Sequence, residues 1–294
     1  MVSWVMSDLP RADLAGVVVG GGCPVVVMGA LNVSPESFHS ESVYRETGAL
    51  VDAALAMIEA GAALIDVGAR STAPYLDTEI SDDEETRRLA TAVDALVAKL
   101  SVPVSVDTCR LDPARAALEG GARILNDVHG IRDRALARLA AEHEVGVILM
   151  AFPEPTGVGR GDHRGPVAMT GELLVACLER ARQAGIPDER VVLDPGIGFF
   201  REGPVSWDVH DVVVLAGLRE LSRLGRPLCV GVSRKSFIGA ITGRAATADR
   251  LAGSLAATAV AVVNGAAVIR THDVAETVDA VRVAERIERA SRDA

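Results

Sequence analysis

The sequence predicts a single-domain α/β protein with a (β/α)8 TIM-barrel fold. Short runs rich in Val, Ile and Leu alternate with Ala-rich, charged segments through most of the chain. Hydrophobic residues make up 49% of the chain but aromatic residues only 3%, which is typical of parallel strands buried on both faces. Repeated β-α units with short connections favour a closed barrel. We therefore expect an N-terminal extension over residues 1–23 and one barrel over residues 24–294.

Each predicted strand is a short aliphatic run bounded by turn residues. In chain order the predicted strands are Pro24–Leu31, Ala63–Gly68, Val102–Asp107, Arg123–Asp127, Val145–Ala151, Val191–Asp194, Leu228–Val232 and Ala267–Arg270. The alternative is a doubly wound open sheet, which usually carries a glycine-rich phosphate-binding sequence after its first strand. Residues Val27–Asn32 are not such a sequence, so the barrel is favoured.

The segments between the strands carry apolar residues at helical spacing, such as Leu50, Ala54, Met57 and Ile58. The predicted helices are Thr47–Ala60, Asp82–Lys99, Pro113–Glu119, Arg132–His143, Thr170–Ala184, Ser206–Arg223, Thr247–Asn264 and Val274–Ala290. Many of them end in glycine just before the next strand, where glycine adopts the left-handed cap conformation at no steric cost.

Composition excludes several classes of partner. A formal net charge of −10 leaves no excess of Lys and Arg to neutralise a nucleic-acid backbone. The four cysteines are scattered without a close pair, which argues against a disulfide framework or a zinc site. We find no apolar stretch of transmembrane length and no signal peptide, so we expect no membrane partner and a cytoplasmic location.

Nearly every predicted strand ends in a polar residue, and in a barrel these ends meet at one rim, where active sites lie. The strand ends are Asn32, Asp66, Asp107, Asn126, Asp127, Met150, Asp194, Ser233–Lys235 and Arg270–His272. Carboxylates and carboxamides could bind a flat, polar heterocycle, because a carboxylate accepts two parallel N–H bonds. The cations of the last two strands, with the helix that follows Lys235, suit an anionic group. A single polar strand end is usually a turn or helix cap, but so many together indicate a binding site.

Six segments carry a resemblance to a known family. They are Asn32–Phe38, Val106–Thr108, Asn126–Val128, Leu193–Phe199, Gly231–Phe237 and Arg270–Val274. In order and spacing, over about residues 24–290, they resemble dihydropteroate synthase. The resemblance implies condensation of 6-hydroxymethyl-dihydropterin pyrophosphate with p-aminobenzoate, giving dihydropteroate and pyrophosphate in folate biosynthesis. Its partners would be these small molecules and a second copy of the chain, in a homodimer formed through the late helices.

The resemblance also implies roles for individual residues. The catalytic residues would be Asn32, Lys235, Arg270 and His272, with Asn32 also a ligand of a Mg²⁺ cofactor. Pterin would be bound by Asp107, Asn126, Met150, Asp194 and Lys235. Pyrophosphate would be bound by Asn32, Thr72, Arg270 and His272, and p-aminobenzoate by Pro74, Phe199, Ser233 and Arg234.

The chain departs from the family pattern in four loops. Ala69–Tyr75 has Arg70 where the family has glutamate and Ala73 where it has arginine, and His39–Ser42 lacks the usual glycines. Met150–Pro153 and Phe200–Glu202 also differ from the family. Three alternatives therefore stay open: a divergent paralogue that transfers the pterin-methyl group to another amine, a catalytically inactive pterin-binding protein, or a methyl-tetrahydrofolate-binding methyltransferase.

Overall fold

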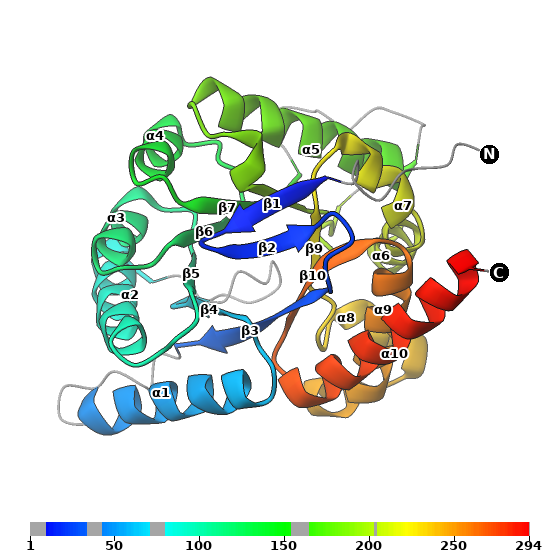
Figure 1. Cartoon of the computed structure of the whole chain (residues 1–294), viewed down its shortest axis with the longest axis horizontal. Coiled ribbons are helices and arrows are strands. Elements are labelled where there is room, and N and C mark those ends of the chain that lie inside the picture. Colours follow the sequence, from blue (N-terminus) through cyan, green and yellow to red (C-terminus); the bar gives the residue numbers. More distant parts are fainter. Residues whose placement is uncertain (1–9, 34–42, 71–79, 154–164, 203–204, 294) are drawn as a thin grey trace.

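A computed structural model describes residues 10–33, 43–70, 80–153, 165–202 and 205–293. Eight parallel strands form a closed barrel, in which the last strand pairs with both the first and the seventh (Figure 1). These strands are β3 (Val26–Asn32), β4 (Leu64–Gly68), β5 (Val104–Asp107), β6 (Ile124–Asp127), β7 (Gly146–Met150), β8 (Val191–Asp194), β9 (Leu228–Val230) and β10 (Ala266–Thr271). The predicted strands and the (β/α)8 barrel are confirmed, and the open sheet is excluded.

Helices surround the barrel and follow the strands in alternation (Figure 1). They are α1 (Val43–Glu59), α2 (Asp82–Val97), α3 (Leu111–Glu119), α4 (Arg134–Glu142), α5 (Pro166–Gln183), α6 (Trp207–Ala216), α7 (Leu218–Leu221), α8 (Ser236–Thr242), α9 (Leu251–Val263) and α10 (Val274–Asp293). The one helix predicted over 206–223 is wrong in its continuity, because Gly217 separates α6 from α7. A Cβ at Gly217 would come within 2.4 Å of the Val167 side chain, so glycine permits the close approach of α5.

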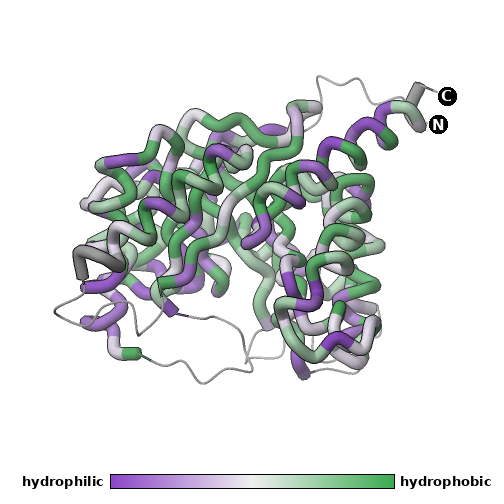
Figure 2. Tube along the Cα trace, turned by 90° about the horizontal axis from the view of Figure 1, so that it is seen from below, coloured by the Kyte–Doolittle hydropathy of each residue, from purple (hydrophilic) through white to green (hydrophobic). Residues whose placement is uncertain are grey.

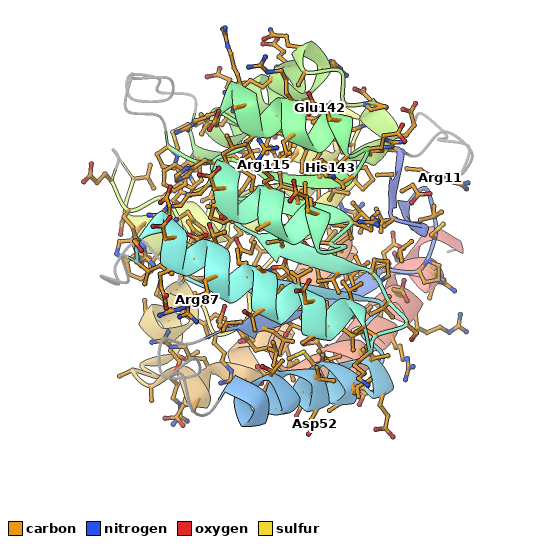
Figure 3. The ribbon with its side chains drawn as sticks, turned by 90° about the vertical axis from the view of Figure 1, so that its left-hand side faces the viewer. Arg11, Asp52, Arg87, Arg115, Glu142 and His143 are labelled. Atoms are coloured by element: carbon orange, nitrogen blue, oxygen red, sulfur yellow. The ribbon has the colours of Figure 1, made fainter. Side chains whose placement is uncertain are left out.

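Most of the helices are amphipathic, as the sequence pattern requires. Hydrophilic and hydrophobic residues alternate along the helices in Figure 2. Charged side chains such as Arg87, Arg115 and Glu142 lie on the outer faces of α2, α3 and α4 (Figure 3). Their inward faces pack on the aliphatic strands in one continuous core. Burial of these faces supplies the main driving force for closing the barrel.

An antiparallel hairpin closes the N-terminal end of the barrel (Figure 1). Its strands are β1 (Arg11–Leu14) and β2 (Val17–Gly20), inside the segment for which the sequence predicted only an extension. Ala12, Leu14 and Val19 are buried against residues that point into the barrel, including Met28 and Ile148. The hairpin therefore completes the hydrophobic core at the N-terminal end of the barrel.

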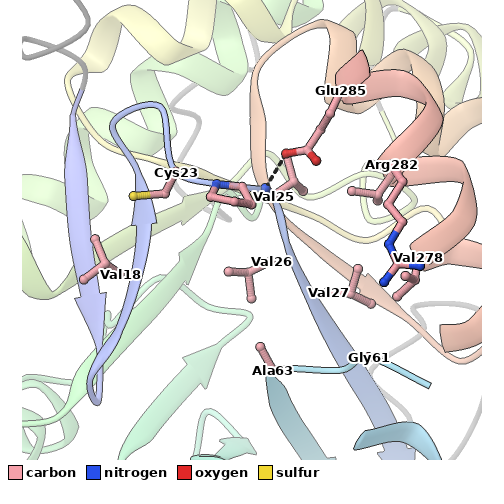
Figure 4. A pocket seen from close by; sticks show the side chains of 12 residues that line it. Val18, Cys23, Val25, Val26, Val27, Gly61, Ala63, Val278, Arg282 and Glu285 are labelled. Carbon is pink, nitrogen blue, oxygen red and sulfur yellow. Dashed lines mark hydrogen bonds between the residues drawn. The ribbon is translucent and has the colours of Figure 1, made fainter. Parts of the chain in front are cut away.

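A pocket of about 370 Å³ lies at this same N-terminal end, beside β3 and α10. Its walls are mostly aliphatic, and the Glu285 carboxylate beside it accepts a hydrogen bond of 2.7 Å from the Val25 backbone N–H (Figure 4). The pocket lies at the opposite end from the polar strand ends, so it is not the candidate active site.

No single helix among the described residues has the length and apolar character needed to span a membrane, although the bent pair Ser236–Thr242 and Thr247–Val263 has both when taken together.

Candidate active site

A buried hydrogen-bond network connects four strands at the C-terminal end of the barrel. The carboxylate of Asp66, on β4, accepts bonds from Ser105 Oγ at 2.6 Å, Asn126 Nδ2 at 3.2 Å and Arg270 Nε at 2.6 Å. Arg270 also donates from Nη2 to Asp107 Oδ2 at 2.9 Å. Residues of β4, β5, β6 and β10 are therefore fixed relative to one another in the interior.

Strand register explains why these side chains meet. Asp107 is paired with Asn126 across β5 and β6, and Met150 with Asp194 across β7 and β8. In parallel strands, paired residues lie side by side and their side chains point to the same face. The register therefore collects a carboxylate, a carboxamide, a thioether and a second carboxylate around the interior.

Asp107 has one carboxylate oxygen that lacks a partner. Oδ2 accepts from Arg270, but the buried Oδ1 has no hydrogen-bond partner within the described part of the chain. Burial raises the pKa of Asp107 to about 7, opposed by the Arg270 charge and reinforced by Asp66. An unsatisfied buried acceptor is uncommon in native proteins and indicates a position for a ligand donor.

Asp194 and Lys235 form the other side of the cluster. Asp194 Oδ1 accepts a hydrogen bond of 2.7 Å from the Gly196 backbone N–H, and burial raises the pKa of the carboxyl group to about 6. Burial lowers the pKa of Lys235 to about 8, and its Nζ lies 4.4 Å from the centre of the Phe199 ring. Both groups are therefore predominantly charged near pH 7, in a desolvated site where charged hydrogen bonds are strong.

Three polar side chains lie together nearer the solvent. His272 Nδ1 lies 3.1 Å from Ser233 Oγ, and His272 Nε2 lies 3.5 Å from Asn32 Nδ2. Burial, followed by the Arg270 charge, lowers the pKa of His272 to about 4. A neutral imidazole at pH 7 offers one N–H donor and one acceptor rather than a cation.

The predicted site residues fall into three groups. The predicted pterin set converges on the barrel interior: four members end strands, and the fifth is the N-cap residue of α8. They are Asp107, Asn126, Met150, Asp194 and Lys235. The predicted pyrophosphate set is divided, because Arg270 points inward to two carboxylates while Asn32 and His272 lie together at the rim. Thr72 and Pro74 lie outside the described residues.

The predicted p-aminobenzoate set is also divided. Ser233 lies at the rim and Phe199 against Lys235. Arg234 is directed to Asp273, with a bond of 3.0 Å from Nε to Oδ2, and its backbone has a positive φ of 57°. Its predicted role in binding p-aminobenzoate stays a prediction.

Two features of the site have no counterpart in the sequence reasoning. Asp66 was recognised only as a polar strand end, yet it binds Arg270 directly. Phe152 lies between His129 and Phe199, with ring centres 4.8 Å and 6.4 Å away. This row of rings comes from three separate loops, so no local sequence signal could identify it.

Arg70, which stands where the family has glutamate, contacts residues outside the cluster of Asp107, Asp194 and Lys235. Its Nε lies 3.8 Å from Glu85 Oε2, and its Nη2 lies 3.6 Å from Cys109 Sγ. Burial raises the pKa of Cys109 to about 11, so this partly buried thiol stays protonated near pH 7 and is a poor nucleophile.

Comparisons with known proteins identify the family of this chain. The model of the pterin binding enzyme family matches residues 28–272. The dihydropteroate synthase of Escherichia coli is 38% identical over 88% of this chain and 90% of its own. A probable bifunctional folylpolyglutamate synthase/dihydropteroate synthase of Haloferax volcanii is 40% identical over 88% of this chain, which spans 30% of that longer protein. The structure of a Xanthomonas albilineans dihydropteroate synthase with 4-aminobenzoic acid superposes with a TM-score of 0.82 at 37% identity, covering 95% of this chain and 98% of that one. The chain therefore belongs to the dihydropteroate synthase family of pterin-binding enzymes.

Proposed function

We propose that the protein condenses 6-hydroxymethyl-dihydropterin pyrophosphate with p-aminobenzoate, giving dihydropteroate and pyrophosphate for folate biosynthesis. The observation that carries the proposal is the buried Oδ1 of Asp107, which has no hydrogen-bond partner among the described residues and lies in a cluster with Asn126, Asp194 and Lys235. Such a cluster suits a flat heterocycle with several donors and acceptors at its edge, and it does not suit an aliphatic substrate.

Each group of the cluster matches a part of the pterin edge. Ionised Asp107 and Asp194 accept from ring and exocyclic N–H groups, and Asn126 offers a donor and an acceptor in one amide plane. Lys235 donates to a ring nitrogen or carbonyl. Asp66 holds Arg270 beside Asp107, so the pocket keeps a positive charge next to its carboxylates.

The reaction needs no protein nucleophile. The bond between the exocyclic carbon and the bridging oxygen breaks, and its electron pair leaves with pyrophosphate. The amine nitrogen of p-aminobenzoate attacks the resulting carbon cation and then releases a proton. The protein's part is to bind both substrates in line and to stabilise the departing charge through the donors of Asn32, Ser233 and His272 at the rim.

The second substrate would lie between the rim and Phe199. The 4-aminobenzoic acid bound by the Xanthomonas relative supports this class of substrate. Ser233 can donate to its carboxylate. The Arg234 guanidinium donates to Asp273 through Nε and Nη2. A guanidinium has five N–H donors, so its other N–H groups can face the carboxylate of the substrate.

Magnesium is proposed as a cofactor that binds mainly through the substrate. Within the described residues no group of three or more acidic, His or Cys side chains could hold a metal ion. Asn32 alone, exposed at the rim, fits an ion that takes most of its ligands from phosphate oxygens and water. When bound, Mg²⁺ would neutralise charge on the leaving pyrophosphate.

We also propose a cytoplasmic homodimer. Large apolar side chains are exposed on α6, α9 and α10, which pack beside one another: Val209, Val212, Val260, Val283 and Ile287. Such a surface is common where subunits associate. Sedimentation equilibrium should show a dimer for the parent protein and a monomer for Val260→Arg. All four cysteines are free thiols, which fits a reducing compartment.

Product analysis tests the activity and separates it from the alternatives. The purified protein is incubated with the pterin pyrophosphate, Mg²⁺ and p-aminobenzoate, and dihydropteroate and pyrophosphate are measured together. Equal amounts of both products, which Asp107→Ala should abolish, support the proposal. Pyrophosphate release only with another amine indicates the paralogue, and pterin binding without any release indicates an inactive binding protein. Rescue of a strain that lacks its own dihydropteroate synthase provides the matching test in cells.

A further inference from the structure

Asp211 is a fully buried carboxylate outside the predicted site. It lies on α6, and its Oδ1 accepts a hydrogen bond of 2.8 Å from the backbone N–H of Gly198. Its Oδ2 is also buried and has no hydrogen-bond partner in the described part of the chain. A buried carboxylate is costly, so its single bond to a loop amide needs an explanation.

The loop that Asp211 holds forms one wall of the site. Gly198 has a φ of +88°, and a Cβ at this position would lie 2.9 Å from Cδ of Lys235. The next residue, Phe199, places its ring 4.4 Å from the Lys235 ammonium. The position of the Gly198 backbone therefore decides where both the Lys235 stem and the Phe199 ring lie.

We propose that Asp211 is a positioning residue for the condensation, acting through the Gly198 amide on Lys235 and Phe199 and thereby setting the affinity for the aromatic amine. The inference rests on the proposed function for its substrate, but its effect on Lys235 is independent of activity. Asp211 is fully buried on α6 and its Oδ1 contacts the Gly198 amide, so its effect on the substrates passes through this loop.

The charges around Lys235 come from four elements. Asp194 on β8, Asp211 on α6 and Asp107 on β5 favour its protonated form, and Arg270 on β10 opposes it. Asp211 is in turn faced by Lys235, Arg201 and Asp208, and burial raises its pKa to about 6. His210 Nδ1 also lies 4.0 Å from Asp211 Oδ1, but burial lowers the pKa of His210 to about 4, so this imidazole is neutral in the same pH range. Above pH 6 the carboxylate is thus ionised and helps to keep Lys235 charged.

The sequence offers an unusually direct measurement, because Lys99 and Lys235 are its only lysines. Protein labelled with ¹³C-lysine gives two ε-methylene signals, and the Lys99→Arg variant assigns them. In the parent protein the Lys235 signal should titrate at about pH 8, and it should remain in the Lys99→Arg variant. Asp211→Asn should move the Lys235 midpoint to lower pH. Asp208→Asn, which removes the same charge from the same helix, should leave it in place. An unchanged midpoint in Asp211→Asn would overturn the electrostatic part of the proposal.

Kinetics and binding test the positioning part. Asp211→Asn retains an oxygen acceptor for Gly198, so its KM for p-aminobenzoate at pH 7 should stay within about twofold of the parent. Asp211→Ala loses the acceptor, and its KM for p-aminobenzoate should rise on the order of tenfold. Pterin affinity by calorimetry should stay near that of the parent in Asp211→Asn. In Asp211→Ala it should fall less than the affinity for the amine, because Asp107, Asn126 and Asp194 still face the pterin when Lys235 moves. Equal losses for pterin and amine in Asp211→Ala, or no rescue by Asn, would show a merely structural role. A parent protein without any condensation activity would contradict the proposed function, while the lysine titration would still decide the role of Asp211.

Discussion

Replacement of Asp107 by asparagine should remove most of the affinity for a pterin. The variant keeps the size of the side chain and an oxygen that can accept from Arg270 Nη2, which lies 2.9 Å from Oδ2 in the parent protein. The Oδ1 position has no partner within the described part of the chain, and the carboxamide NH₂ that replaces it cannot accept a hydrogen bond. The amide of asparagine therefore cannot accept two parallel N–H bonds as a carboxylate does. One ligand donor then loses its partner in a buried site.

The magnitude follows from that loss. A hydrogen bond to a charged group contributes about 1.5–3 kcal/mol, and 1.4 kcal/mol corresponds to a factor of ten in affinity. We therefore expect pterin to bind about 10- to 100-fold more weakly to Asp107→Asn. Alanine leaves Arg270 with one carboxylate partner fewer as well, so Asp107→Ala should bind pterin more weakly still.

The pH dependence gives a second signature of the same group. The pKa of Asp107 is raised to about 7, so the free protein gains a proton there as the pH falls below 7. A protonated carboxyl group cannot accept both N–H bonds, so pterin affinity in the parent protein should fall, up to about tenfold per pH unit. The Asp107→Asn variant has no titrating carboxyl group at this position, so this part of the pH dependence of pterin affinity should disappear.

Calorimetric titration with 6-hydroxymethylpterin between pH 6 and 8.5 measures both effects. Ser233→Ala is the matched control, because Ser233 lies at the rim beside His272 and should affect the second substrate but not pterin. Thermal unfolding confirms that each variant is folded. Unchanged pterin affinity in Asp107→Asn, or the same pH dependence in parent and variant, would refute the assignment of the pterin site.

Three further outcomes are expected. Asp66→Asn removes the charge that Arg270 Nε contacts at 2.6 Å, while Asp107 remains as its second partner, so urea denaturation should show a loss of about 1.5–3 kcal/mol; an unchanged midpoint would mean that the buried pair is not stabilising. Leu14→Ala should cost about 2–5 kcal/mol because this hairpin side chain is fully buried, while Val18→Ala on the exposed face of the same hairpin should stay within about 0.5 kcal/mol. A chelator should weaken binding of the pterin pyrophosphate but not of pterin alone, and Asn32→Ala should reduce that difference; equal binding of both ligands with and without chelator would remove the proposed metal.

The repeating pattern of the sequence was sufficient for the fold and for the pool of candidate residues. Parallel strands buried on both faces must be aliphatic, and their carboxyl ends must meet at one rim when the sheet closes. Asp107, Asn126 and Asp194 each end an aliphatic run, so their convergence follows from the fold class alone. The continuity of residues 206–223 did not follow, because the break at Gly217 depends on how closely α5 approaches.

Only the tertiary structure decided which of these polar groups pair with one another. Arg270 and Asp66 are 204 positions apart, and nothing near either residue indicates that the guanidinium turns inward rather than toward an anionic substituent at the rim. The hairpin Arg11–Gly20 is stabilised by packing against side chains of the barrel strands, so its own short sequence does not indicate that it closes the barrel. Asp211 likewise carries no local signal of its role, because its contact with Gly198 forms only when α6 packs on the loop after β8. Local propensity and periodicity depend on a few neighbouring residues. Hydrogen-bond partners in a desolvated core depend instead on which strands and loops the closed barrel places side by side.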